Sequence, residues 1–303
     1  MRHYDDAAID AALAGADLAG TLRSAFVDFA RGDAAMQPRM RTACGAITLS
    51  TLGAVWPREG FAGAKVYTTV AGRFAFVIVL FSAQTGAALA TFDAGAITRW
   101  RTASVSTLAA RRFARPDAGR LALFGTGVQA RAHLDAFAEA FALRSVRIVS
   151  RGPAEAFATH ARTLVADVRV TGPLEALRGA DLVVTATRAT EPLFDGTWVE
   201  PGAMIAAVGS SKPEAREIDD ALLARARAIV VEWRDQTLRE AGDLVRADPA
   251  VLAQVPIVDL GAALAGEDAS PDAEGDVVVF ESVGVGLADV AAAALAYRRL
   301  HEA

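Results

Sequence analysis

Cysteine is nearly absent from this chain of 303 residues, because Cys44 is the only one. A single cysteine cannot form an intrachain disulfide, so we expect a protein of a reducing compartment. A lone thiol is weak evidence for a nucleophile, and we interpret Cys44 as a core or loop residue. The histidines lack the spacing of metal ligands, so the sequence predicts no metal site. They are His3, His133, His160 and His301.

Long apolar runs and an excess of basic residues are also missing. The longest clean apolar run covers residues 74–81, far short of the roughly 20 residues of a membrane span. The first residues carry no apolar stretch of the signal-peptide kind, so we expect a cytoplasmic protein without a membrane partner. The formal net charge of -5 gives no general attraction to phosphate backbones, which argues against a nucleic-acid partner.

What is present suits a two-domain globular protein, with 53% hydrophobic and 22% charged residues. Apolar residues at helical spacing predict one or two helices over residues 6–29. Short β-rich segments with intervening turns then predict an antiparallel meander. A further helix over 97–114 ends before Pro116, and residues 115–119 are the best candidate for a domain boundary. The predicted strands of the meander are 46–49, 65–70, 73–81 and 87–92.

Beyond Pro116, short apolar strands alternate with helices. This alternation predicts an α/β domain with a parallel sheet covered on both faces, the doubly wound architecture. A last helix from about residue 287 follows the final strand, and periodicity does not decide with which domain it packs. The predicted strands are 121–124, 145–149, 168–170, 182–185, 204–208, 229–232 and 277–280.

The strongest local signal is the G-x-G-x-x-A sequence from Gly125 to Ala130, between a predicted strand and a predicted helix. Gly125 permits a tight turn, and Gly127 lets the backbone approach a pyrophosphate at the helix N-terminus. An NAD enzyme of this architecture carries Asp or Glu at the end of the next strand. This chain has Ser150 and Arg151 there. Arg151 could pair with a 2′-phosphate or could be a solvated loop cation, and we favour NADP(H) over NAD(H).

Several segments together resemble the ornithine cyclodeaminase/mu-crystallin family across nearly the whole chain. The resemblance implies an α/β fold in which a Rossmann-type doubly wound domain, residues 117–286, binds NAD(P). It also implies a smaller α+β domain, residues 1–116, that binds substrate, forms a homodimer through its sheet and is joined by the C-terminal helix 287–303. The segments are 63–65, 85–86, 101–103, 125–130, 180–187, 201–203, 207–210, 217–219, 240–243 and 280–284, followed by Asp289.

The resemblance also implies the roles of individual residues. By spacing alone, Arg41, Lys65 and Arg101 are ordinary surface charges, but the cations at matching positions hold a substrate carboxylate or a nearby cofactor phosphate. Arg39 lies two residues from Arg41 and competes for that match. The residues implied to contact the cofactor, besides Gly125 and Gly127, are Thr102, Thr126, Val128, Gln129, Ser150, Arg151, Thr187, Val208 and Ser282.

One departure from the family pattern bears on the reaction. Cyclodeaminases carry an aspartate where this chain has Ser211, and a neutral hydroxyl is a poor substitute when an ammonium group must be deprotonated and expelled. Members with serine resemble ketimine and pyrroline-2-carboxylate reductases, whose reaction needs a hydride and one proton. Ser211, a water molecule or Glu240 could relay that proton, although Glu240 could equally be a structural carboxylate at a helix end.

We therefore predict an NAD(P)H-dependent oxidoreductase that reduces a small cyclic imino acid. Three alternatives remain open at this point. The protein could be an ornithine cyclodeaminase that converts L-ornithine to L-proline and ammonia, or an alanine-type amino-acid dehydrogenase. It could also be a crystallin-like protein that binds NADP(H) and a small ligand without turnover, although three converging cations have no evident use in an inactive site.

Overall fold

The computed structural model describes residues 1–266 and 276–302, which fold into two compact units. Unit 1 consists of Met1–Val105 and Gly284–Ala303, and unit 2 consists of Ser106–Val283. One division falls inside the long helix α3 (Ala94–Phe113), and the C-terminal helix α12 (Gly286–Glu302) belongs to the same unit as the N-terminus. None of the helices in the described ranges is both long and apolar enough to span a bilayer.

Unit 1 is built on a mainly antiparallel sheet, and the predicted meander is confirmed. Strands β4 to β7 pair in sequence order, each antiparallel to the next. Strand β1 joins β7 in the parallel direction, and β2 and β3 both pair with β4. None of these three is among the predicted strands, and β1 and β2 have only three and two residues. The strands are β1 (Arg2–Tyr4), β2 (Ala35–Met36), β3 (Met40–Cys44), β4 (Ile47–Trp56), β5 (Phe61–Val70), β6 (Arg73–Ser82) and β7 (Ala88–Asp93).

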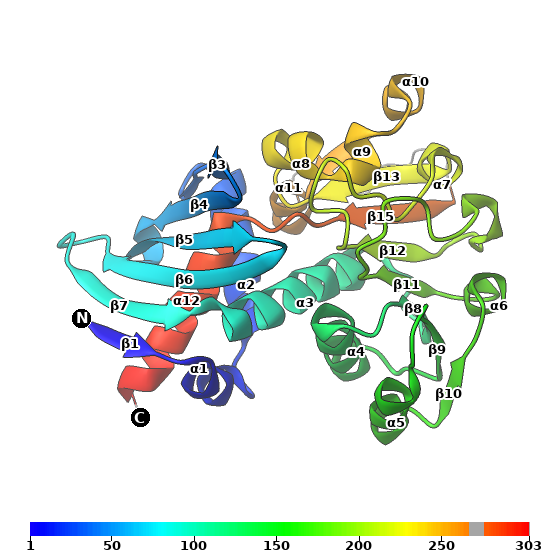
Figure 1. Ribbon diagram of the computed structural model, residues 1–303, viewed down its shortest axis with the longest axis horizontal. Coiled ribbons are helices and arrows are strands. Elements are labelled where there is room, and N and C mark those ends of the chain that lie inside the picture. The colour runs from blue at the N-terminus through cyan, green and yellow to red at the C-terminus, as the bar shows by residue number, and fades with distance from the viewer. Residues whose placement is uncertain (267–275, 303) are drawn as a thin grey trace. The chain divides into compact units, whose positions relative to one another are not determined.

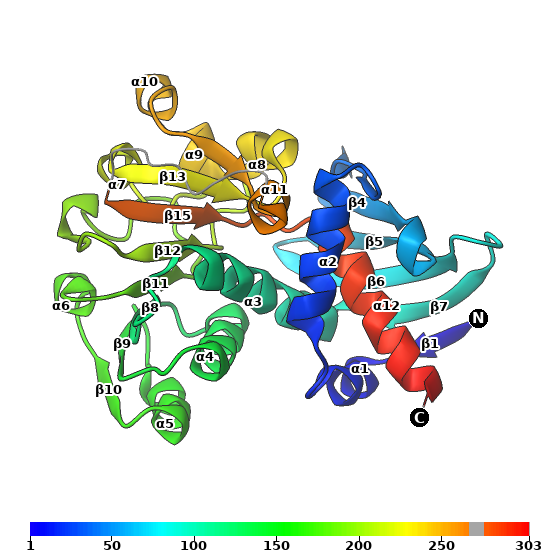
Figure 2. The same ribbon diagram turned by 180° about the vertical axis from the view of Figure 1, so that it is seen from behind.

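Helices cover one face of this sheet, as Figures 1 and 2 show from opposite sides. Asp5 caps α1 (Asp6–Leu13) and Asp17 caps α2 (Leu18–Ala30), each through a 2.8 Å hydrogen bond from a backbone N–H. Helix α12 lies against β4, β5 and β6 and beside α2. A Cβ on Gly286 would lie 2.5 Å from the carbonyl oxygen of Gly53, so glycine is needed where α12 begins against β4.

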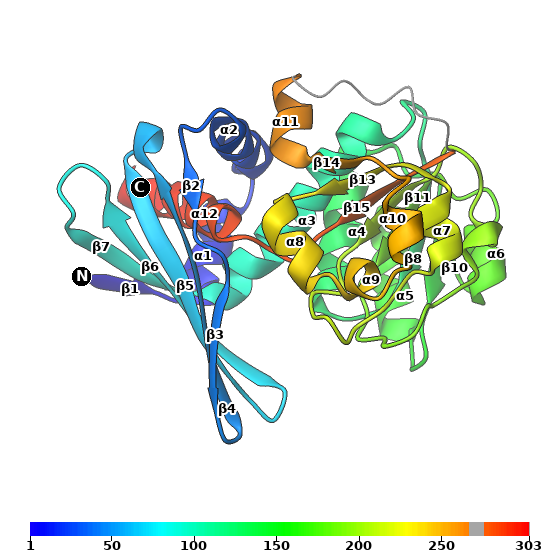
Figure 3. The same cartoon turned by 90° about the horizontal axis from the view of Figure 1, so that it is seen from above.

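The other face of the same sheet is apolar, and no described helix of unit 1 covers it. Leu49, Val55 and Val77 are 44%, 46% and 36% exposed, whereas Leu52 and Ile78, on the inner face, are fully buried. Figure 3 shows the hairpin of β5 and β6 extending past α2 and α12. Three aromatic residues cluster near its end, where Tyr67 and Phe74 lie 5.1 and 5.5 Å from Phe76 between ring centroids.

Unit 2 contains a parallel sheet of eight strands in the order β10-β9-β8-β11-β12-β15-β13-β14. The predicted doubly wound architecture is confirmed, and the three-residue strand β14 is not among the predicted strands. The strands are β8 (Arg120–Phe124), β9 (Ser145–Val149), β10 (Asp167–Val170), β11 (Leu182–Thr185), β12 (Met204–Ala207), β13 (Ala226–Val231), β14 (Ile257–Asp259) and β15 (Val277–Glu281).

Both faces of this sheet are covered. Successive residues of a strand point to opposite faces, and the four residues from Leu121 to Phe124 in β8 are all at most 1% exposed. Such burial on both faces explains why these strands read as continuous apolar runs. The helices of unit 2 besides α3 are α4 (Val128–Ala140), α5 (Glu155–Leu164), α6 (Pro173–Leu177), α7 (Asp220–Ala224), α8 (Arg234–Glu240), α9 (Gly242–Val245), α10 (Pro249–Leu252) and α11 (Leu260–Ala265), with a 3-10 turn η2 (Gly196–Trp198).

The register of the parallel strands brings four loops to one edge of the sheet. Phe124 pairs with Thr185, Thr185 with Ala207, and Ala207 with Glu281. These residues end β8, β11, β12 and β15, so the segments that follow them all begin at the carboxyl edge. In open parallel sheets ligands bind at this edge, where the strand order reverses. Here the reversal lies at β8, which has β9 on one side and β11 on the other.

A buried carboxylate fastens the opposite edge. Asp181 precedes β11 and accepts hydrogen bonds of 2.9 and 3.0 Å from the backbone N–H groups of Gly119 and Arg120. Its side chain also pairs with Arg115 and Arg144. Although burial raises the pKa of Asp181, these hydrogen bonds outweigh it and hold the pKa below its usual value. Asp181 therefore joins the start of β11 to the start of β8.

Candidate functional site

The turn after β8 has the geometry expected for dinucleotide binding. Gly125 has φ +109°, and a Cβ there would lie 2.6 Å from the carbonyl oxygen of Ala186, so glycine is needed for the turn. Gly127 precedes α4, and a Cβ at this position would meet no atom within 4 Å. The missing side chain thus leaves open space above the N-terminus of α4, where backbone N–H groups and the helix dipole attract an anion.

The predicted cofactor residues around this turn are accessible to a ligand. Val128 is 65% exposed at the start of α4, which is unusual for a large apolar residue. The hydroxyls of Thr126 and Ser150 lie 3.4 Å apart, and Ser150 Oγ accepts a 3.2 Å hydrogen bond from Gly152 N. Arg151 is exposed beside them, and Gln129 is half-buried in the first turn of α4.

Three further predicted cofactor residues follow β11, β12 and β15 at the same edge. Thr187 and Val208 are half-buried. Ser282 is 3% exposed, and its hydroxyl has no hydrogen-bond partner among the described residues. A buried hydroxyl without a partner is costly unless a ligand or water supplies one. Ser282 is therefore a candidate for a direct contact with a bound molecule.

Glu217 joins two of these loops, a role that its sequence motif alone did not disclose. Its Oε1 accepts hydrogen bonds from Thr187 N at 2.7 Å and Thr187 Oγ1 at 2.6 Å. Its Oε2 accepts from Thr185 Oγ1 and Gly209 N, both at 2.8 Å. A Cβ on Gly209 would lie 2.5 Å from this carboxyl group. Burial raises the pKa of Glu217 to about 7, although the hydrogen bonds from Thr187 and Thr185 oppose the shift.

Two further buried carboxyl groups, those of Asp243 and Glu281, lie near Glu217. Asp243 Oδ1 accepts hydrogen bonds from the backbone N–H groups of Glu217 at 2.6 Å and Ile218 at 3.0 Å. Glu281, fully buried at the end of β15, accepts a 3.3 Å hydrogen bond from Ser210 Oγ. Burial, and then repulsion from Asp243 and Glu217, raises the pKa of Glu281 well above its usual value. Burial also raises the pKa of Asp243.

The two predicted residues for proton transfer lie in different surroundings. Ser211 is half-buried and follows Ser210, whose carbonyl oxygen accepts a 2.9 Å hydrogen bond from Gly242 N. Glu240 is 5% exposed in α8, where its Oε2 accepts a 3.1 Å hydrogen bond from Gln236. Their catalytic roles remain predictions.

In unit 1 the structure brings Lys65 and Arg101 together on Asp289. Lys65 Nζ lies 2.8 Å from Asp289 Oδ2 and 3.0 Å from Oδ1, and Arg101 Nε lies 3.0 Å from Oδ1. All three side chains are at most 5% exposed. They come from β5, α3 and α12, so segments far apart in sequence form one buried cluster. Burial alone would raise the pKa of Asp289, but the attraction of Lys65 and Arg101 outweighs it and lowers that pKa.

Lys65 has an unusual acidity for a lysine. Burial lowers its pKa to about 8, attraction by Asp289 opposes this shift, and repulsion by Arg101 and Arg39 adds to it. Lys65 is therefore mainly cationic at pH 7 and loses its charge in mildly alkaline solution. The cluster holds two buried cations and one carboxylate, so it carries a net positive charge.

Arg39 extends the charge of this cluster. It is half-buried, donates a 2.8 Å hydrogen bond from Nη2 to the carbonyl oxygen of Gly284, and contributes to the low pKa of Lys65. Arg41 is exposed on β3. Spacing could not decide between them, because the direction of each side chain depends on how β3 meets its neighbours. Thr102 is 7% exposed and donates its hydroxyl hydrogen to Thr98 O at 2.7 Å, within α3.

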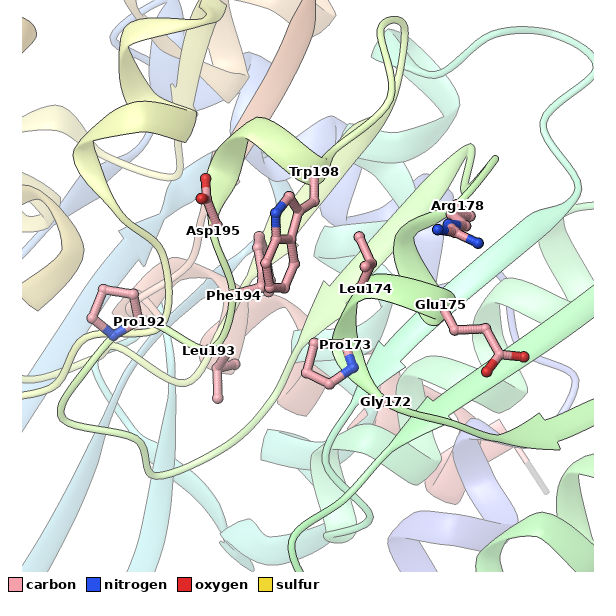
Figure 4. Close-up of a pocket in the computed structure, with 10 residues that line it drawn as sticks. All are labelled: Gly172, Pro173, Leu174, Glu175, Arg178, Pro192, Leu193, Phe194, Asp195 and Trp198. Carbon is pink, nitrogen blue, oxygen red and sulfur yellow. The ribbon is translucent and has the colours of Figure 1, made fainter.

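A separate pocket of about 790 Å³ lies in unit 2 (Figure 4). Trp198 and Phe194, from the segment around η2, line it together with Pro173 and Leu174 of α6. It includes none of the residues that the sequence predicts for the cofactor or for catalysis. This pocket therefore gives no support to the predicted site, which depends on the sheet edge and on the cation cluster.

The chain is similar in sequence and fold to several known proteins. The chain is 39% identical to the ketimine reductase mu-crystallin of Mus musculus over 223 residues, which cover 73% of this chain and 68% of the relative. The crystal structure of a probable ornithine cyclodeaminase from Bordetella pertussis Tohama I is 49% identical, with a TM-score of 0.96 over 100% of this chain and 97% of that chain.

An archaeal alanine dehydrogenase, solved as a dimer with bound NAD, has a TM-score of 0.91 and 25% identity over 100% of this chain and 96% of that chain. The model of one protein family matches residues 4–303. The chain belongs to the ornithine cyclodeaminase/mu-crystallin family.

Proposed function

We propose that this family member is an NADP(H)-preferring reductase of a small cyclic imino acid, such as Δ1-pyrroline-2-carboxylate or Δ1-piperideine-2-carboxylate. The observation that carries the proposal is the buried cluster of Lys65, Arg101 and Asp289, with its surplus of positive charge. A buried surplus charge is costly unless an anion offsets it. The single carboxylate of an imino acid is an anion of suitable size and charge.

The residues of unit 2 fit a nicotinamide dinucleotide. Gly127 leaves room for a pyrophosphate at the start of α4, and the buried hydroxyl of Ser282 lacks a partner in the described structure. Thr126, Ser150 and Arg151 border the ribose end, where no carboxylate is present to repel a 2′-phosphate. When bound, the dinucleotide supplies the hydride that reduces the C=N carbon.

The chain's own residues would then fix the substrate and supply a proton. Lys65 and Arg101 hold the substrate carboxylate through charge-assisted hydrogen bonds, which orient the carbon that accepts the hydride. The imine nitrogen needs one proton, which Ser211, Glu240 or a water molecule relays. This light demand favours reduction over cyclodeamination, since Ser211 is uncharged where cyclodeaminases have an aspartate.

A direct assay tests the reaction. We expect the enzyme to oxidise NADPH with either cyclic imino acid, and to release no ammonia from L-ornithine with NAD⁺, because Ser211 cannot act as the missing carboxylate. Dinucleotide absorbance and an ammonia assay provide the measurements. Ammonia and proline from L-ornithine would instead identify a cyclodeaminase, ammonia from L-alanine a dehydrogenase, and dinucleotide binding without any turnover a binding protein.

The low pKa of Lys65 predicts a pH dependence of substrate binding. Lys65 is charged below pH 8 and neutral above it, so we expect KM for the imino acid to rise by up to about tenfold per pH unit above pH 8. Steady-state kinetics from pH 6.5 to 9.5 measure this. In K65R the guanidinium stays charged throughout this pH range, so the rise in KM that is due to Lys65 should be absent. Any change in KM that is due to titration of the imino acid itself should remain. A flat profile in the wild type would contradict the role of Lys65.

Arg151 provides a test of cofactor preference. We expect R151A to lower kcat/KM for NADPH by about tenfold or more and to leave kcat/KM for NADH unchanged, because only NADPH has a phosphate with which the guanidinium can pair. Paired kinetics with both dinucleotides give the ratio. The control is R162A, since Arg162 is also an exposed arginine and pairs with Glu155 on its own helix. An equal loss with both dinucleotides would argue against a 2′-phosphate contact.

We also propose that the protein is a homodimer that pairs through the outer face of the unit 1 sheet. Contiguous exposed apolar surface is typical of protein interfaces, and this face contains Leu49, Val55 and Val77. A carboxylate on that face would have to be desolvated in a dimer, so we expect L49E/V77E to be monomeric by light scattering. L164E changes an equally exposed leucine of α5 and should remain dimeric. A wild-type monomer, or a dimeric double variant, would refute the proposal.

The single cysteine fits a protein that works in a reducing compartment, and we propose a cytoplasmic location on that basis.

A further inference from the structure

Glu217 lies between the two loops that carry the predicted cofactor residues Thr187 and Val208 of unit 2. One oxygen of its carboxyl group binds the backbone and hydroxyl of Thr187, and the other binds the backbone of Gly209. Thr187 is itself a predicted cofactor residue, and Gly209 follows another one, Val208. The backbone of Glu217 is held in turn by Asp243. Asp243 thus holds the backbone of Glu217, while the carboxyl group of Glu217 binds both loops.

We propose that Glu217 is a positioning residue for the dinucleotide, which joins the backbone after β11 to the backbone after β12 and so sets the places of Thr187 and Val208. This inference rests on the proposed function only in naming the dinucleotide as the ligand. Glu217 itself need not touch the cofactor, because its four hydrogen bonds all go to the chain.

The hydrogen-bond pattern fits an ionised carboxylate best. Four donors converge on two oxygens, and the donors Thr187 N and Gly209 N belong to the backbone and cannot turn into acceptors. A glutamine has one carbonyl oxygen and one NH2 group. In either orientation its NH2 group would face Thr187 N–H or Gly209 N–H, so one of the two loops would lose its tie. A proton on Glu217 weakens these ties, because the protonated oxygen is a poorer acceptor and its O–H must point at a hydroxyl that turns round to accept it.

Glu217 therefore gives the site a dependence on pH. The titratable groups packed around it are Asp243 from α9 and Glu281 from β15, and both disfavour a second negative charge. The neighbouring Arg216 is directed elsewhere, with Nη2 2.6 Å from Asp220 and Nε 3.0 Å from the carbonyl oxygen of Ile218. Within the described residues, hydrogen bonds stabilise the charge of Glu217, and that charge is lost as the pH falls through about 7.

Dinucleotide affinity is the decisive measurement, because it needs no turnover. At pH 8.5 we expect E217Q to raise Kd for NADH and NADPH by about tenfold, as measured by quenching of protein fluorescence. In the wild type, Kd should rise by a similar factor from pH 8.5 to pH 5.5, whereas in E217Q it should stay nearly constant. NADH is the primary probe, because the 2′-phosphate of NADPH itself titrates near pH ~6. In kinetics, the change should appear in KM for the dinucleotide and not in KM for the imino acid.

Two further variants separate positioning from general stability. D181N weakens a buried carboxylate at the opposite end of β11, so it should lower the thermal stability and leave Kd and its pH profile unchanged. T185V removes one hydroxyl donor to Glu217 while keeping the side-chain shape. The pKa of Glu217 should then rise further, and the midpoint of the Kd profile should move to higher pH. This variant provides the test even if E217Q does not fold.

The proposal fails if E217Q binds NADH as tightly as the wild type, or if T185V leaves the midpoint of the wild-type profile in place. These outcomes differ from a failure of the proposed reaction. An enzyme that binds NADH with the expected pH profile but reduces no imino acid would overturn the reaction and leave the role of Glu217 intact.

Discussion

Buried carboxylates hold the loops of unit 2 at both edges of its sheet, and those at the carboxyl edge fix the loops beside the dinucleotide turn. Asp181 accepts hydrogen bonds from backbone N–H groups at the amino edge of the sheet, and Glu217 and Asp243 accept them at the carboxyl edge. A parallel sheet fixes its strands through ladder hydrogen bonds but leaves the connecting loops without partners for their N–H groups. A buried carboxylate can accept several such donors at once, and a backbone hydrogen bond to a charged group is stronger than one between neutral groups. The loops thereby gain defined positions without regular secondary structure.

In unit 1 a buried carboxylate binds cationic side chains instead of backbone N–H groups. Asp289 lies between Lys65 and Arg101 and neutralises part of their charge. Removing one carboxylate and two cations from water is expensive, and a pair of charges with good geometry recovers only part of that cost. The remaining positive charge suits the anionic substrate that we propose, and Asp289 fixes the two cations in place. Preorganised charges of this kind bind a carboxylate without first ordering flexible side chains.

Two glycines set how closely neighbouring elements approach. Gly286 allows the start of α12 to contact the backbone of β4, and Gly209 allows the carboxyl group of Glu217 to reach the loop after β12. A side chain at either position would push apart the groups that the site needs together. Gly209 lies in the segment 207–210 of the family resemblance, and the structure gives it a steric reason.

Sequence alone determined the features that depend on local order. The alternation of apolar strands and helices specified the doubly wound sheet, the turn from Gly125 to Ala130 specified the dinucleotide turn, and the pattern of short motifs specified the family. The tertiary structure decided which distant residues meet: Arg39 approaches Lys65, Asp289 joins two cations, and Glu217, Asp243 and Glu281 form one buried group. Residue spacing could not predict these contacts. In the sequence, an acidic residue in an apolar segment has the same appearance whether it caps a helix, faces solvent or accepts four hydrogen bonds. Its role is set by the register of strands far apart in the chain, and that register exists only in the folded protein.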